Sequence, residues 1–137
     1  MTKPEINLIN TTDINMDDLT PAMKHFLEVK REHPECLMLY HMGDFYETFF
    51  EDAVLLSKVL ELTLTGREAG AKYGRIPLAG IPAKAVNVYL EKLVQKNIKV
   101  AICDQLEDPK QAKGLVRRGV TRVVTAGTLT ASDLLKQ

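Results

Sequence analysis

Apolar runs alternate with amphipathic segments along the chain. The first amphipathic segment follows Thr20-Pro21, an N-cap with proline at the first helical position, and predicts a helix that ends before Pro34. Residues 36–42 form a nearly continuous apolar run of strand length, which is typical of a strand covered on both faces. Gly43-Asp44 interrupts this run and predicts a turn.

The rest of the chain repeats this alternation. Apolar side chains recur at helical spacing in two further segments, 51–61 and 84–96. Short strands are expected at 62–65, 76–81, 98–103 and 120–125. Residues 66–74, punctuated by glycine, are expected to be the tip of a hairpin. The pattern therefore predicts an α/β fold (α+β-like) with a mixed sheet flanked by helices.

The length of 137 residues fits one domain. Residues 1–19 are polar, and we expect a loosely ordered tail there. The folded domain is expected to span residues 20–131. Residues 132–137 are expected to start a short terminal helix or to be the stump of a linker.

The charge balance bears on whether this chain could bind nucleic acid. Lysine plus arginine total 18, and aspartate plus glutamate also total 18. A general DNA binder is normally basic, because neutralising phosphates supplies most non-specific affinity. Neutrality thus argues against a tight grip by this chain alone, but it suits a module that reads the shape of a duplex held by something else.

The cysteines and the hydropathy pattern add little specific chemistry. Cys36 and Cys103 have no metal-ligand spacing and are expected to be buried thiols in a reducing cytoplasm. No apolar run approaches the roughly 20 residues that span a bilayer, so no membrane partner is expected. The three histidines are scattered, and no metal site or catalytic residue is predicted.

Residues 42–50 carry the most informative chemistry. In an extended segment, Phe45 and Glu47 project from the same face, roughly 7 Å apart. An aromatic ring can wedge into a base stack while the neighbouring carboxyl group hydrogen-bonds the disturbed base. Burial in an aromatic core is the alternative for Phe45, and most large apolar side chains are buried. Taken alone, Glu47 would be a solvated surface carboxylate.

Four landmarks occur in a fixed order along the chain: Met-Gly-Asp-Phe-Tyr-Glu at 42–47, and the segments 76–82, 100–105 and 123–129. From about residue 20 to about residue 135, the chain closely resembles the N-terminal mismatch-recognition domain of the MutS family of DNA mismatch repair proteins. The family usually has proline where this chain has Ala126. The resemblance implies that Phe45 and Glu47 face DNA, while the other aromatic residues of 42–50 belong to the core.

The resemblance also implies a function. The expected partner is double-stranded DNA with mispaired or unpaired bases, approached from the minor groove, where Phe45 inserts and Glu47 hydrogen-bonds the displaced base. MutS-like proteins are longer, dimerise and hydrolyse ATP with Mg²⁺. The present sequence lacks a Gly-x-x-x-x-Gly-Lys-Ser/Thr loop, so no ATP site, cofactor or enzyme activity is expected in it. Two alternatives stay open: a non-reading structural module of a repair complex, and a nuclease with acids converging on a metal.

Basic residues gather in a window without acids, which is either a solvated face or a strip of phosphate contacts. From it we select Arg117, Arg118 and Arg122 as candidate contacts with the DNA backbone. Arg67 and Lys72, expected at the hairpin tip, are similar candidates. The resemblance places Arg67 near the DNA.

Overall fold

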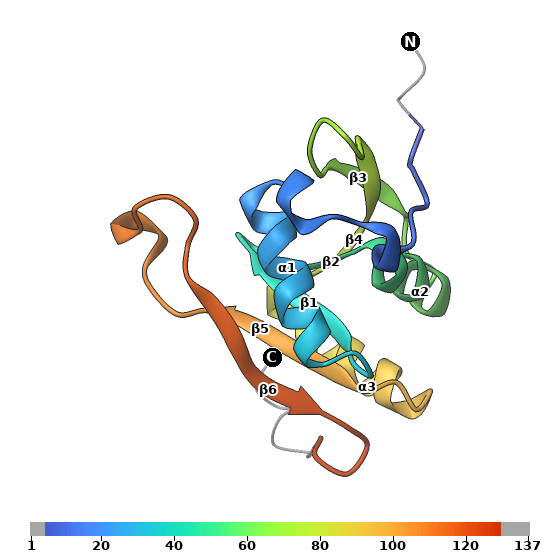
Figure 1. The fold of residues 1–137 in the computed structure, drawn as a ribbon. Coiled ribbons are helices and arrows are strands. Elements are labelled where there is room, and N and C mark those ends of the chain that lie inside the picture. Colours follow the sequence, from blue (N-terminus) through green and yellow to red (C-terminus); the bar gives the residue numbers. More distant parts are fainter. Residues whose placement is uncertain (1–4, 130–137) are drawn as a thin grey trace.

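A mixed sheet of six strands, in the order β3-β4-β2-β1-β5-β6, forms the centre of the computed structural model, which describes residues 5–129 (Figure 1). The strands are β1 (Leu37–Met42), β2 (Phe45–Phe49), β3 (Thr65–Glu68), β4 (Arg75–Pro82), β5 (Val100–Gln105) and β6 (Arg118–Val124). β1 and β5 run parallel, and all other neighbouring pairs are antiparallel. The structure confirms the predicted α/β class and the mixed sheet.

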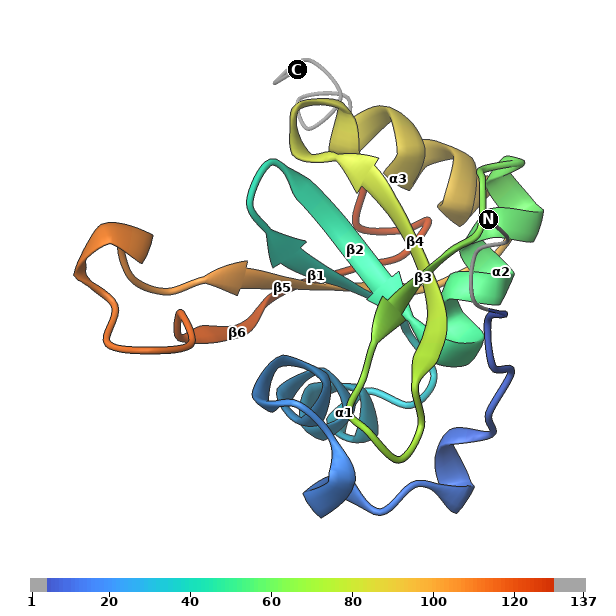
Figure 2. The same ribbon diagram turned by 90° about the horizontal axis from the view of Figure 1, so that it is seen from above.

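Helices cover both faces of the sheet (Figure 2). α1 (Pro21–Glu32) packs on one face, and α2 (Phe50–Leu60) and α3 (Val86–Gln95) lie on the other. β1 contributes to both layers: Met38 and Tyr40 enter the core under α1, while Leu37 and Leu39 enter the core under α2 and α3. Because both faces are covered, the apolar run of β1 is continuous rather than alternating.

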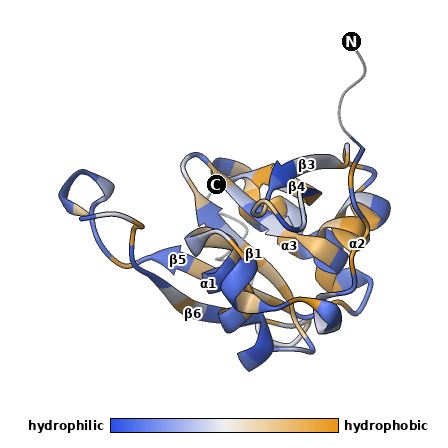
Figure 3. Ribbon diagram, turned by 45° about the horizontal axis from the view of Figure 1, so that its top comes forward, coloured by the Kyte–Doolittle hydropathy of each residue, from blue (hydrophilic) through white to orange (hydrophobic). Residues whose placement is uncertain are grey.

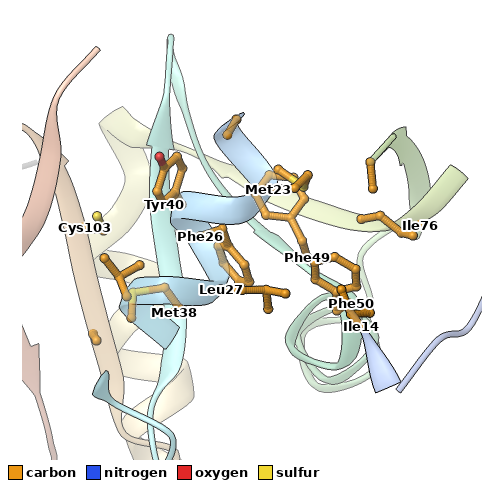
Figure 4. Close-up of a cluster of buried hydrophobic side chains, with 14 of the residues drawn as sticks. Ile14, Met23, Phe26, Leu27, Met38, Tyr40, Phe49, Phe50, Ile76 and Cys103 are labelled. Carbon is orange, nitrogen blue, oxygen red and sulfur yellow. The ribbon is translucent and has the colours of Figure 1, made fainter. Parts of the chain in front are cut away.

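The core under α1 is rich in aromatic side chains (Figure 4). The ring of Phe26 meets the ring of Phe49 edge to face, with centroids 4.9 Å apart, and lies 6.0 Å from the ring of Tyr40. Edge-to-face pairs of this kind add to the stabilisation from area burial alone. Helix α1 is thereby fixed over the buried half of β2.

A buried ion pair ties α1, β1 and α2 together. Asp52 of α2 accepts a hydrogen bond of 3.0 Å from the backbone N–H of Met38. The Lys30 ammonium of α1 lies 3.0 Å from the same carboxylate and also donates to the Cys36 carbonyl oxygen. Asp52 thus satisfies a strand N–H that lies beyond the paired residues of β2, which reach only Tyr40 on β1.

The N-terminal segment differs from the expected loose tail. Residues 5–19 contain two short 3-10 turns, each begun by an asparagine whose side chain accepts a backbone N–H: Thr11–Asp13 and Met16–Asp18. Ile14 is buried in the core under α1, and the Asn15 N–H donates to the Tyr73 hydroxyl at 2.8 Å. The cause is local turn chemistry, because asparagine and aspartate stabilise turns through their own side chains. The predicted linker at 132–137 lies outside the described residues.

The hairpin β3–β4 is also placed differently. Its first strand was expected at 62–65 but occupies Thr65–Glu68, so Gly66 and Arg67 lie in a strand and not in the tip. A Cβ on Gly66 would lie 2.4 Å from the Arg75 side chain, so this glycine serves a close approach and not a turn. The other predicted elements lie within two residues of the observed ones. Among the described residues, no helix is both long and apolar enough to cross a membrane.

Candidate nucleic-acid interface

A two-residue turn, Gly43-Asp44, joins β1 to β2 and presents Phe45 at its end, since Met42 pairs directly with Phe45. Gly43 has a φ of +60° and Asp44 does not have a positive φ, which is the pattern of a type II′ hairpin turn with glycine at its first position. Because side chains alternate along a strand, Phe45, Glu47 and Phe49 share the face that carries α1.

Exposure falls steadily along this face of β2. Phe45 is 46% exposed, the Glu47 side chain is 20% exposed, and Phe49 is fully buried. Phe50 is buried, as expected, whereas Tyr46 is only half-buried and packs against the core under α2 and α3. The core alternative therefore applies to Phe49 and Phe50 but not to Phe45, whose ring is open to a ligand.

A hollow of about 530 Å³ lies beside Phe45. It is lined by His41, Gly43, Asp44, Phe45, Pro82, Ala83 and Lys84. The Ala83 N–H donates to the Asp44 carbonyl oxygen at 2.8 Å and fixes this segment to the turn. Lys84 is exposed and forms no ion pair with another described residue. The sequence did not reveal Lys84 as a candidate, because only the pairing of Phe45 with Pro82 across β2 and β4 brings it near the Phe45 ring.

Glu47 occupies a confined position in the middle of the sheet. It lies opposite Tyr40 on β1 and opposite Gly80 on β4. A Cβ on Gly80 would come within 3.3 Å of the Glu47 Cγ, so the glycine leaves room for this side chain. Burial raises the pKa of Glu47, and the charge of Arg67 opposes that rise. A carboxyl group with a raised pKa is protonated more readily, and in that form it can donate a hydrogen bond.

On the opposite face of the sheet, a row of polar side chains links β2 to β1, β5 and β6. The Tyr46 hydroxyl donates to Asp104 of β5, and the Thr121 hydroxyl of β6 donates to the other oxygen of Asp104 at 2.6 Å. His41 stacks on the Tyr46 ring, with centroids 4.9 Å apart. Burial and the bond to Asp104 raise the pKa of Tyr46, so its hydroxyl stays a donor. These contacts therefore fix β2 through Tyr46, on the face of the sheet opposite to Phe45.

Arg118 requires a correction. It was predicted to contact the DNA backbone, but its side chain is turned into the fold and is only 8% exposed. Its guanidinium donates to the His41 carbonyl oxygen at 2.6 Å and to the Val116 carbonyl oxygen at 2.8 Å. It also lies over the Tyr40 ring, 4.9 Å from the centroid. Arg118 is thus a structural residue, and it interrupts the strip of phosphate contacts inferred from the sequence.

The remaining basic candidates lie in different settings. Arg67 projects from β3, one-third exposed, and its Nη1 lies 3.8 Å from the Glu47 Oε1. Lys72 is at the hairpin tip, as expected, and pairs with Asp18 at 3.2 Å. Arg117 is exposed at the base of the arm 106–117, which projects from the body between β5 and β6 and has a hydrophilic tip (Figure 3). Arg122 is half-buried on β6. The structure therefore brings only Arg67 into contact with the predicted reading pair.

One group in the described part of the chain has metal-binding residue types close together. A ligand atom from each of His33, Glu35 and Cys36 lies within 4.8 Å of the others. Burial and the neighbouring Glu35 charge raise the pKa of the Cys36 thiol, which disfavours the thiolate that metals require. The group holds a single carboxylate, unlike the several acids of the nuclease alternative. We assign it no metal.

Comparison with known proteins shows the family to which this fold belongs. The family model described as MutS domain I matches residues 20–133. The chain belongs to this family. It is 56% identical over 118 residues to the DNA mismatch repair protein MutS of Symbiobacterium thermophilum, covering 86% of the chain and 14% of that protein.

Two further relatives agree. The DNA mismatch repair protein MutS of Prochlorococcus marinus strain NATL2A is 51% identical over 121 residues, covering 88% of the chain and 13% of that protein. The MutS of Synechococcus elongatus is 45% identical over 137 residues, covering 99% of the chain and 16% of that protein. The chain thus spans a small fraction, 13–16%, of the length of these relatives.

Proposed function

We propose that this domain recognises mispaired or unpaired bases in double-stranded DNA during mismatch repair. The observation that carries the proposal is the exposure of Phe45 at 46%, at the open end of a strand whose next aromatic residue on the same face is fully buried. At the end of a strand, the exposed ring adds little to the core and leaves a π-face free to stack on a base, which supports a nucleic-acid ligand. The family match supports DNA as that ligand.

Phe45 acts as a wedge in this mechanism. It enters from the minor groove beside the mispaired base, unstacks the step and kinks the duplex. Unstacking costs a few kcal/mol, and it costs less where pairing is already defective. Stacking on an aromatic ring returns roughly 1–3 kcal/mol, and every base offers a π-face. Specificity therefore comes from deformability more than from base identity, which lets one ring serve many mismatches.

Glu47 inspects the displaced base. Protonated, it donates a hydrogen bond to that base, and burial in the sheet already favours protonation. Ionised, it repels the phosphates of an intact duplex, which suppresses binding where no base is displaced. Both effects favour defective DNA over matched DNA.

Because the chain has no net charge, its overall field does not attract DNA. Individual cations must therefore contact the phosphates of the duplex. Lys84 beside the wedge and Arg117 on the arm are exposed and suited to phosphate contacts, which position the domain without reading sequence. We place ATP hydrolysis with Mg²⁺ and dimerisation in the portions of MutS relatives that this chain does not match. A cytoplasmic location is part of the same proposal.

The proposal is tested in the full-length protein that carries this chain. Affinity is measured for a G·T duplex, an unpaired-T duplex and the matched duplex of the same sequence. Phe45→Ala is expected to remove the preference for both defective duplexes, a loss of roughly 5- to 150-fold for a stacking energy of about 1–3 kcal/mol.

The matched control is Leu55→Ala. Leu55 is a similarly exposed apolar residue on α2, 39% exposed, and its loss is expected to leave the preference intact. Unchanged discrimination in Phe45→Ala would remove the wedge and favour a non-reading structural module.

A further inference from the structure

Arg67 reaches the reading strand from two strands away. It lies on β3, and β4 separates β3 from β2. Its guanidinium lies 5.8 Å from the centroid of the Phe49 ring, and Nη1 lies 3.8 Å from the Glu47 Oε1. Gly80 of β4 pairs with Glu47 and has no side chain, so it leaves space beside the carboxylate on this face. Arg67 reaches that carboxylate across β4.

Other charged and titratable groups face the same region from the neighbouring elements. On β1, Tyr40 lies opposite Glu47, and its hydroxyl forms a 2.7 Å hydrogen bond with His25 of α1. From β6, Arg118 lies over the Tyr40 ring, but its N–H groups are committed to carbonyl oxygens. Among the described residues, Arg67 is the cation that forms an ion pair with Glu47.

We propose that Arg67 is the positioning residue for Glu47 and passes from the carboxylate to a DNA phosphate when a duplex binds. In the free protein, the ion pair holds Glu47 in place and opposes the rise in its pKa that burial causes. In the complex, a phosphate binds the guanidinium, and Glu47, now enclosed without its counter-charge, takes up one proton from solvent. That proton forms the hydrogen bond to the displaced base. This inference rests on the function proposed above.

Two properties of Arg67 suit it to this exchange. Its side chain is 33% exposed, so a phosphate can reach it while the pair is formed. Guanidinium is weakly hydrated and binds phosphate through two parallel hydrogen bonds, whereas the 3.8 Å contact with Glu47 is longer than a charge-assisted hydrogen bond. A phosphate therefore competes well against the loose ion pair.

The first experiment needs no DNA. The Glu47 carboxyl carbon is followed by NMR through a pH titration of the 137-residue chain, in wild type and three variants. Arg67→Gln is expected to raise the pKa of Glu47, and Arg67→Lys to restore it towards wild type. Lys72→Gln is the matched control, because Lys72 is a cation of the same hairpin that pairs with Asp18 instead. An unchanged Glu47 titration in Arg67→Gln overturns the proposal.

The second experiment measures affinity for a G·T duplex and a matched duplex against pH, in the full-length protein. Wild-type preference for G·T is expected to fall as pH rises, because Glu47 must take up a proton. Arg67→Gln is expected to move that fall to higher pH, and Glu47→Gln to remove the pH dependence with or without Arg67. If Arg67→Gln weakens both duplexes equally and leaves the pH profile in place, Arg67 is an ordinary phosphate contact and the proposal fails.

The two experiments separate this inference from the proposed function. If Phe45→Ala keeps full discrimination while the Glu47 titration responds to Arg67, the wedge is lost and the ion pair stands. If Phe45→Ala removes discrimination and the titration ignores Arg67, the function stands and the exchange of partners is refuted.

Discussion

Phe45 and Phe49 are the same residue type on the same strand and the same face, yet one is 46% exposed and the other is fully buried. The difference is what covers them. Helix α1 places the Phe26 ring against Phe49, 4.9 Å away, whereas Phe45 lies at the turn beside an open hollow. A single strand thus has a buried half and an exposed half, and the apolarity of the two residues does not distinguish them.

The most direct way to break this comparison is to truncate each ring. Phe49→Ala is expected to cost about 3–5 kcal/mol of unfolding free energy, because it leaves a cavity in the core under α1. Phe45→Ala is expected to cost less than about 0.5 kcal/mol, as for other exposed sites. Urea unfolding of the 137-residue chain measures both. Similar costs for the two variants would contradict the division of β2 into two halves.

Arg117 and Arg118 sharpen the comparison, because they are adjacent but oppositely exposed. Arg118→Ala is expected to lower the unfolding free energy by about 2 kcal/mol, because it leaves two carbonyl oxygens unpaired. Arg117→Ala is expected to leave stability unchanged and to reduce the slope of log affinity against log salt by about 1 in the full-length protein. A reversed pattern would show that Arg118 leaves the fold to bind phosphate.

Glu47 lies on β2 between Phe45 and Phe49. We expect its effect on the unfolding free energy to be the smallest of these predictions. Its pKa is raised in the folded state, so the folded state holds the proton more tightly than the unfolded state does. The stability it contributes is complete below its ordinary value of 4.5 and is lost as pH rises through the folded-state pKa. Glu47→Gln does not titrate, so its stability relative to wild type should increase between about pH 4 and about pH 7, by less than about 1 kcal/mol. Urea unfolding at the two pH values measures the difference in unfolding free energy between Glu47→Gln and wild type. A difference that does not change with pH would contradict the prediction.

Local signals carried most of the fold. Thr20-Pro21 marks the start of α1, and the unbroken apolar run at 36–42 marks a strand covered on both faces. Gly43-Asp44 marks the hairpin turn between β1 and β2. Each depends on propensities of neighbouring residues, which a sequence displays directly.

What the sequence did not display depends on pairing between distant segments. The contact of Arg67 with Glu47 needs the order β3-β4-β2, and the position of Lys84 needs the register of Phe45 with Pro82. Burial of Arg118 needs β6 to pair with β5 past a register shift at Ile102/Cys103. The roles of Phe45 and Glu47 came from resemblance to a family, because composition alone favoured a core ring and a surface acid.

The packing of residues 5–19 bears on how this domain should be excised for study. The family match begins at residue 20, but Ile14 is only 6% exposed, and the Asn15 N–H donates to the Tyr73 hydroxyl of the β3–β4 hairpin at 2.8 Å. A fragment that begins at residue 20 would expose the apolar surface that Ile14 covers. It would also lose the hydrogen bond that ties residue 15 to the hairpin that carries Arg67. A fragment whose ends are chosen from alignment alone would therefore be prone to aggregate, although it still contains Phe45, Glu47 and Arg67.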